Sequence, residues 1–234
     1  MFEFPSQKTI TYSRVIHLSH LIDRQIPLWP GDPPVEFEPA AELNRDGYYL
    51  RRFSMGEHSA THMNAPNSFH AEGAGIDAYP AESLVVPAVV VDIRARAGAS
   101  PDFALTPADV LQWEREYGQI PTGTVVLLYT GWQEKWPNPD AFLNGGRFPG
   151  FAGETARFLL DERGIAGVGT DTHGVDGCDA TFATNRLVLE RGGIVLENLT
   201  NLHQLPSTGT TLAIGILRLR GGSGSPAGVI AFVP

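Results

Sequence analysis

The chain has 234 residues, of which 42% are hydrophobic and 18% are charged, as in a globular protein with one large domain over residues 1–234. Its net charge of -9 excludes nucleic acid and an anionic membrane surface as partners. One cysteine, Cys178, forms no internal disulfide, residues 1–14 lack a signal peptide pattern, and no apolar run is long enough to span a bilayer. These features predict a soluble cytoplasmic protein.

Apolar runs alternate with helix signals along the whole chain, which predicts an α/β fold without a linker that would divide it. Strands are expected at residues 14–19, 48–55, 84–93, 125–129, 165–170, 194–199, 211–219 and 229–233. Helices are expected at residues 106–117, 153–163 and 182–191, and each is followed by glycine within two residues. We expect strand 48–55 to run directly into the histidine-rich stretch that follows it, and a glycine-rich turn at 221–224 to join the last two strands.

Histidines gather in residues 57–70, which contain three of the seven in the chain. His58, His62 and His70 are spaced by four and then eight residues, and imidazoles four residues apart can converge on one metal ion. The proline and small residues between them favour a tight turn over a long helix. The alternative is a loop whose polar residues are unrelated to one another.

Polar residues also follow two predicted buried strands. His173 lies in the segment 171–176 at the end of one strand, where functional groups concentrate in α/β folds. Glu197 ends an apolar run, so it either faces solvent or is buried with a partner. Trp29 lies in the stiff loop 27–34 and either forms the wall of a pocket or anchors the core.

Several of these stretches, in order, resemble the cyclase family of metal-dependent hydrolases, which includes bacterial kynurenine formamidase and isatin hydrolase. The segments that carry the resemblance are HLSH at 17–20, WPGDP at 29–33, HSATHMNAP at 58–66, GTDT at 169–172, ENLTNL at 197–202 and GGSGSP at 221–226. The resemblance implies a swivelling β/β/α fold with a mixed central sheet and flanking helices, assembled as a homodimer or homotetramer. It also implies hydrolysis of a C–N or ester-type bond in a small, often aromatic, metabolite. In such enzymes a divalent ion activates water, and the last histidine of the motif moves protons.

Three residues depart from the family pattern. Asn64 replaces the ligand aspartate, Ser68 the proton-transferring histidine, and Asn185 a later histidine, whereas Glu197 is retained. Neutral amides stabilise a dehydrated cation far less than a carboxylate does. We therefore expect at most one zinc or manganese ion, held weakly by His58, His62 and the Asn64 carbonyl.

Three functions remain open. In the first, a metal-dependent hydrolase opens an amide, lactam or lactone, with Glu197, His70 and Ser68 as catalytic residues. In the second, a metal-free cyclase, dehydratase or isomerase uses the same scaffold, and in the third a pseudoenzyme binds a metabolite without turnover. The residues predicted to bind the substrate are Trp29, Phe69, Asn185 and His173, with Arg51, Arg52 and Trp132 as further candidates if the substrate is an aromatic acid.

Two geometric predictions follow. His58 and His62 should point into one pocket with ring nitrogens close enough to share a ligand. Glu197 should reach the same pocket, and burial should raise its pKa unless a cation offsets the effect.

Overall fold

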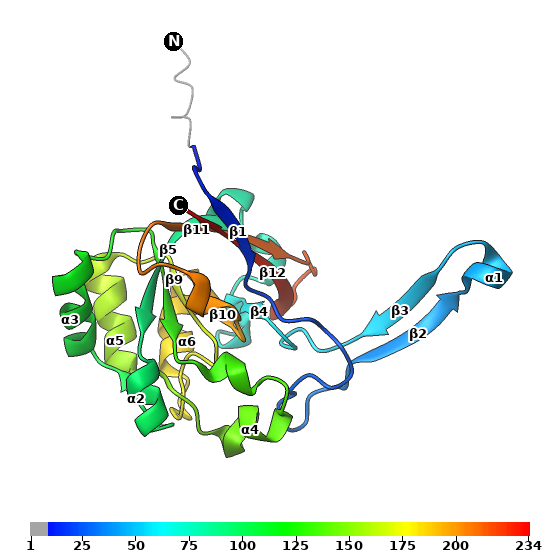
Figure 1. Ribbon diagram of the computed structural model, residues 1–234, viewed down its shortest axis with the longest axis horizontal. Coiled ribbons are helices and arrows are strands. Elements are labelled where there is room, and N and C mark those ends of the chain that lie inside the picture. Colours follow the sequence, from blue (N-terminus) through cyan, green and yellow to red (C-terminus); the bar gives the residue numbers. More distant parts are fainter. Residues whose placement is uncertain (1–8) are drawn as a thin grey trace, which may run out of the picture.

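An eight-stranded mixed sheet forms the centre of the computed structural model, which describes residues 9–234 (Figure 1). The strand order is β1-β12-β11-β5-β7-β9-β10-β4, and β4 also pairs with β12, so the sheet curls toward a closed barrel. The strands are β1 (Arg14–His17), β4 (His62–Asn64), β5 (Val85–Asp92), β7 (Val125–Tyr129), β9 (Gly167–Thr170), β10 (Ile194–Glu197), β11 (Thr210–Ile216) and β12 (Gly224–Val233). The prediction that residues 1–14 are no signal peptide falls largely on residues 1–8, which lie outside the described part.

Strands β5, β7, β9 and β10 pair in parallel, and the other neighbours pair antiparallel. All five residues of β7 are buried, which explains its unbroken apolar sequence. Helices flank this parallel part of the sheet (Figure 1). The helices are α1 (Leu43–Asp46), α2 (Arg94–Ala99), α3 (Pro107–Tyr117), α4 (Pro139–Leu143), α5 (Gly153–Phe158) and α6 (Ala183–Glu190). Two further small sheets pair β2 (Glu36–Ala41) with β3 (Leu50–Ser54), and β6 (Ala104–Leu105) with β8 (Gly150–Phe151).

Helix α3 begins where the sequence predicts. The Thr106 side chain accepts a hydrogen bond from the Asp109 backbone, and the Asp109 side chain accepts one in return, which forms a capping box. The predicted second helix is α5, which continues as a π-helical turn (Leu159–Arg163) and ends at Gly164 with a positive φ of 60°. Among residues 9–234, no helix is long and apolar enough to cross a membrane.

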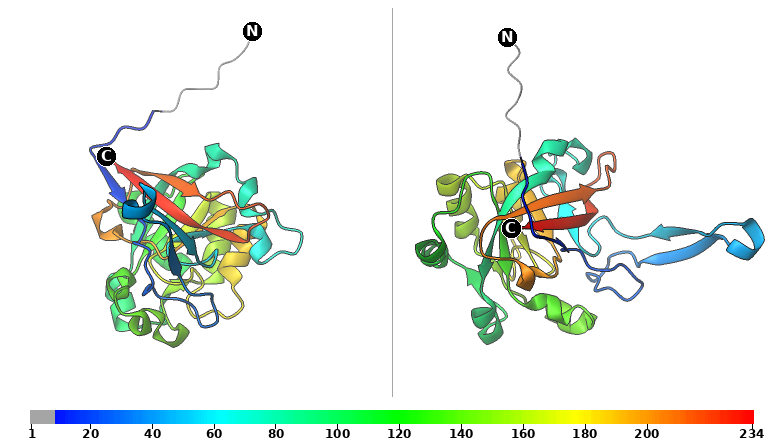
Figure 2. Two further views of the ribbon diagram at one scale, coloured as in Figure 1. Left: turned by 90° about the vertical axis from the view of Figure 1, so that its right-hand side faces the viewer. Right: turned by 45° about the horizontal axis from the view of Figure 1, so that its top comes forward.

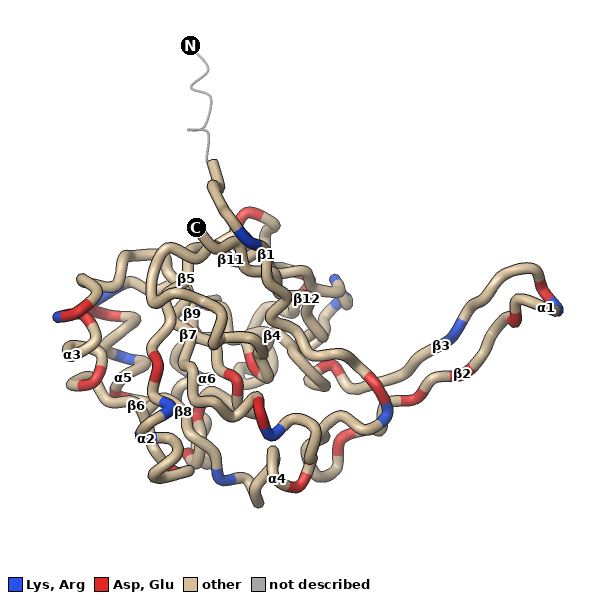
Figure 3. The backbone as a smooth tube through the Cα atoms, viewed as in Figure 1, with Lys and Arg blue, Asp and Glu red and all other residues tan. Residues whose placement is uncertain are grey.

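Two predicted strands are placed differently. Residues 48–55 do not enter the central sheet, because β3 pairs with β2 in an arm that projects from the body (Figures 1 and 2). All residues of β3 are exposed, and a turn separates it from the histidines. The last strand begins at Gly224 instead of residue 229, because Gly224 pairs with Asn64 on β4. Acidic and basic residues are interspersed along the backbone in Figure 3, and on the arm Arg52 pairs with Glu38 at 3.3 Å.

Candidate active site

Strand pairing brings the predicted site residues together. On β4, His62 lies opposite Glu197 of β10, and Asn64 lies opposite Gly224 of β12. Directly opposed residues of antiparallel strands extend to the same face of a sheet. The prediction that Glu197 reaches the pocket of the histidines is confirmed by this register.

A cavity of about 730 Å³ opens over these strands. Nine of the ten predicted site residues line it: Trp29, His58, His62, Asn64, Ser68, Phe69, His173, Asn185 and Glu197. Within the cavity wall, the Ser68 hydroxyl lies 2.6 Å from the carbonyl oxygens of Ala65 and Ser223, so it ties two loops together.

His70 is the exception. The chain turns through a 3₁₀ segment (Pro66–Ser68) after β4 and carries the His70 ring toward α6. There its Nε2 forms a hydrogen bond of 3.0 Å with the Arg186 carbonyl oxygen. His70 therefore lies outside the cavity, and the geometry gives no support to its predicted role as a base.

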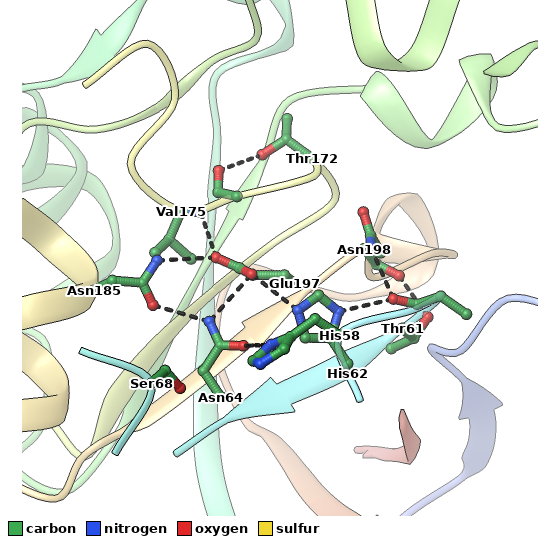
Figure 4. Close-up of polar contacts among 12 residues, drawn as sticks. His58, Thr61, His62, Asn64, Ser68, Thr172, Val175, Asn185, Glu197 and Asn198 are labelled. Carbon is green, nitrogen blue, oxygen red and sulfur yellow. Dashed lines mark hydrogen bonds and ion pairs between the residues drawn. The ribbon is translucent and has the colours of Figure 1, made fainter. Parts of the chain in front are cut away.

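Four N–H groups surround the buried Glu197 carboxylate (Figure 4). Oε1 accepts from the Val175 backbone at 3.0 Å and from Asn185 Nδ2 at 3.1 Å. Oε2 accepts from His62 Nε2 at 3.0 Å and from Asn64 Nδ2 at 3.2 Å. Burial opposes ionisation, but the His62 hydrogen bond and charge, together with the other donors, lower the pKa of Glu197 to about 2. The cation that the sequence prediction required is therefore His62.

Both ring nitrogens of His62 face acceptors. Its Nδ1 lies 2.9 Å from the carbonyl oxygen of Ala60, and its Nε2 lies 3.0 Å from Glu197 Oε2. The ring is thus held between a carbonyl oxygen and a carboxylate. Ala60 has a φ of 56°, a conformation that favours glycine, which explains why the family motif has glycine at this position.

Two carboxylates fix the orientation of the Asn64 and Asn185 amides. Asn185 Nδ2 lies 2.7 Å from Asp176 Oδ2 and 3.1 Å from Glu197 Oε1, so this atom must be the nitrogen. Its oxygen then accepts from Asn64 Nδ2 at 2.9 Å. Since Asn64 Nδ2 also faces Glu197, the Asn64 oxygen is left to accept from His58 Nδ1 at 2.9 Å. The proton on His58 Nδ1 therefore follows from the position of the two acids.

The second ring nitrogen of His58, Nε2, lies 2.9 Å from the Ser223 hydroxyl. Glu57 in turn accepts from the Ser223 backbone at 2.7 Å and lies 2.8 Å from its hydroxyl. Burial, and then the charge of His62, lower the pKa of His58. Both imidazoles point into one cavity, as predicted, with ring centroids 5.3 Å apart. Their nitrogens nevertheless face different partners and share no position.

This donor set does not fit a divalent ion. Every ring nitrogen of His58 and His62 already faces another polar group of the site: Asn64 Oδ1, Ser223 Oγ, the Ala60 carbonyl oxygen and Glu197 Oε2. The Asn64 NH₂ group also points into the space between Glu197 and Asn185, where it would repel a cation. No group of three His, Cys, Asp or Glu side chains within residues 9–234 is arranged to hold a metal. The single zinc or manganese ion stays a prediction.

Aromatic rings form the walls of the cavity. Trp29 stacks on His173 with ring centroids 5.1 Å apart and planes 11° apart, and Phe148 approaches Trp29 edge-on at 6.4 Å. Across the cavity, Phe69 and Phe182 are 5.4 Å apart. Of the two predicted roles of Trp29, the structure therefore supports the pocket wall over the core anchor.

Some residues were misplaced or missed by sequence reasoning. Arg51 and Arg52 lie on the projecting arm, and Trp132 is buried beside Phe142, to whose carbonyl it donates a hydrogen bond, so none of the three lines the cavity. The residues that sequence reasoning missed are Glu57, Phe148, Asp176, Phe182 and Ser223. A strand-end signal was available only for Asp176, because the others reach the site through long-range contacts.

Fold and site together define a mixed α/β protein whose cavity has a polar floor and aromatic walls. The chain belongs to the cyclase family, since the family model described as "Putative cyclase" matches residues 16–177, more than half of its length. It is 31% identical over 217 residues to an isatin hydrolase of Roseibium aggregatum, covering 86% of this chain and 82% of that protein. It is 27% identical over 215 residues to a kynurenine formamidase of Salinibacter ruber, covering 91% and 94%.

Solved structures of isatin hydrolase and of a potential metal-dependent hydrolase also resemble this chain. Isatin hydrolase A from Ralstonia solanacearum superposes with a TM-score of 0.88 at 30% identity, covering 94% of this chain and 92% of that one. A structure titled a potential metal-dependent hydrolase with cyclase activity shares the fold, with a TM-score of 0.74 at 23% identity. The predicted family and α/β fold are confirmed. The prediction of a hydrolytic enzyme is confirmed as well, because both named relatives are hydrolases.

Proposed function

We propose that this enzyme hydrolyses an amide, lactam or ester bond in a small, flat, aromatic compound that lacks a carboxylate, without a divalent ion. The observation that carries the proposal is the cavity of about 730 Å³ with aromatic walls and a floor of fixed polar groups. Such a shape suits a planar ring that stacks on Trp29 while its carbonyl group meets the floor. The similarity to isatin hydrolases supports a cyclic amide as the first compound to test.

The charge of the cavity favours a neutral substrate. No lysine or arginine is among its lining residues, whereas four carboxylates line it: Asp32, Asp176, Asp179 and Glu197. An anionic substrate would meet repulsion there without a cation to offset it, because His62 is already paired with Glu197. The aromatic acid considered from the sequence is therefore the less suitable substrate.

The floor is a fixed network of polar groups. His62, a metal ligand in the family motif, is held here between the Ala60 carbonyl and the Glu197 carboxylate. Both Glu197 oxygens are occupied by groups of the floor itself, two on each oxygen, so its role is to organise the floor.

A substrate panel with metal analysis tests this function. The purified enzyme is assayed on neutral lactams, formanilides and phenyl esters and on carboxylated analogues of each, before and after dialysis against a chelator. We expect turnover of a neutral compound, at least tenfold lower kcat/KM for its carboxylated analogue, and a change of less than twofold on chelation. Loss of activity on chelation that is restored by zinc or manganese would contradict the metal-free part. Reaction in ¹⁸O-water that leaves the product unlabelled would indicate the isomerase or dehydratase, and binding without turnover would indicate the pseudoenzyme.

We infer in addition that the chain forms a homodimer or homotetramer in the cytoplasm. The arm exposes apolar side chains to solvent, which are Leu43, Tyr48, Tyr49, Leu50 and Phe53. Exposed apolar surface of this kind marks protein contacts, and the resemblance implies an oligomer. A single unpaired cysteine fits a reducing compartment. Light scattering on the purified chain and fractionation of the source cells test the two inferences.

A further inference from the structure

His173 differs from the other histidines of the cavity in its hydrogen bonding. It follows β9 at the carboxyl end of the parallel strands, and its ring lines the cavity. Neither of its ring nitrogens forms a hydrogen bond within residues 9–234, whereas all four nitrogens of His58 and His62 do. His173 Nδ1 is buried, and Nε2 remains accessible from the cavity.

The surroundings of His173 hold the ring in place and favour its neutral form. Trp29 covers one ring face, and Phe148 and Phe142 approach it edge-on with centroids at 6.4 Å. Burial, and then the charge of His62, lower the pKa of His173 to about 4, although Glu197 opposes the shift. At neutral pH the ring therefore carries one proton and one lone pair.

The neighbouring Asn198 indicates which nitrogen holds that proton. Asn198 Oδ1 is buried without a hydrogen bond, and its Nδ2 donates to the Ala60 carbonyl at 2.8 Å, which fixes the amide orientation. Asn198 Oδ1 favours a protonated ring at His173. Because Nδ1 is the buried nitrogen, we assign the proton to it, which leaves the lone pair on Nε2 of a ring that lines the cavity.

We propose that His173 is the general base of this enzyme and takes over the proton transfer that the family motif assigns to the position of Ser68. The inference rests on the proposed function. In the first step Nε2 accepts a proton as a water oxygen forms its bond to the substrate carbonyl carbon. In the second step the tetrahedral intermediate collapses, the C–N or C–O bond breaks, and Nε2 returns the proton to the leaving nitrogen or oxygen.

Chemical rescue by imidazole separates this role from a structural one. The variants are His173→Gly, which leaves space beside Trp29 for an added imidazole, and His173→Gln, which keeps a side chain in that space. We expect both variants to lose at least 100-fold in kcat/KM while their Kd for a non-hydrolysable lactam analogue stays within threefold of wild type. Added imidazole should restore at least tenfold in His173→Gly alone, in proportion to its unprotonated fraction. His70→Gly, which removes a histidine outside the cavity, serves as the control and should neither lose activity nor respond.

The possible outcomes are distinguishable. Activity of either His173 variant within threefold of wild type overturns the assignment and leaves the proposed function standing. Failure of imidazole to restore a folded His173→Gly variant, checked by its thermal melting curve, also overturns it. A wild-type enzyme that is inactive on every compound of the panel removes both proposals together.

Discussion

Exchange of Asn64 for the aspartate of the family motif should destabilise the protein at pH 7. The NH₂ group of Asn64 lies 2.9 Å from Asn185 Oδ1 and 3.2 Å from Glu197 Oε2, and Asn64→Asp places an oxygen there. Two hydrogen bonds are lost, and two carboxylates come together at a separation of 3.2 Å, which costs about 5 kcal/mol at an effective dielectric constant of about 20.

Protonation limits this cost. Raising the pKa of the new carboxyl group from about 4 to about 7 costs about 4 kcal/mol, which is less than the repulsion between two carboxylates. The variant therefore takes up a proton at this site. For a chain of this size, a loss of about 4 kcal/mol lowers Tm by about 8–16 °C. Because the folded-state pKa is raised above the unfolded value, the deficit is largest at neutral pH and shrinks as pH falls toward 4.

Differential scanning calorimetry with and without manganese or zinc measures the effect. A cation between the two carboxylates would relieve their repulsion, and binding at 100 times Kd returns about 2.7 kcal/mol to the variant. Asn67→Asp is the matched control, because Asn67 donates only to the Gly221 carbonyl at 3.0 Å, outside the site. A Tm for Asn64→Asp within 1 °C of wild type at pH 7 would refute this account of the floor. Equal stabilisation of the wild type and the variant by the metals would also refute it.

Three further outcomes are expected. Glu197→Gln removes the buried carboxylate that faces His62 and should cost about 3 kcal/mol in urea unfolding. The pKa of Glu197 is lowered to about 2, so the stability it contributes is present above the ordinary value of about 4.5 and fades as pH falls toward 2. The gap between wild type and variant should therefore narrow between pH 5 and pH 3. Trp29→Ala removes a stacking surface worth about 1 kcal/mol and should raise KM for the aromatic substrate about fivefold in steady-state assays, more than it changes kcat. Tyr49→Ser combined with Phe53→Ser should convert the proposed oligomer to monomers in light scattering without lowering the Tm of the body.

Much of the fold could be predicted because its signals are local. The buried strand β7 is a continuous apolar run, and α3 has a complete capping box in its own sequence. The arm could not be predicted in this way, since its exposed strands have ordinary strand composition and nothing local shows that they leave the body. The early start of β12 depends on Gly224 meeting Asn64, a pairing between distant segments.

Most residues of the site could be predicted from the sequence, but the hydrogen-bonding roles of their atoms could not. Motif and pattern together identified nine residues that line the cavity, but the histidine spacing added His70 to them, because sequence spacing does not show where a turn directs the next side chain. The donor or acceptor role of each atom depends on partners that lie far away in sequence. Ser223 is 165 residues from His58, and no pattern around either residue links them.

The two asparagines that depart from the family pattern act as one unit. A carboxylate only accepts hydrogen bonds, whereas an amide donates at one atom and accepts at the other. Between Glu197 and His58, Asn64 must donate on one side and accept on the other. Asn185 cannot rotate to suit a new partner, because Asp176 and Glu197 both hold its nitrogen. An aspartate at position 64 therefore opposes Asn185 as well as Glu197, and no single reversion restores the family site. The sequence departs from its family through a matched pair of amides, which hydrogen-bond to each other where the family motif has an acid and an imidazole.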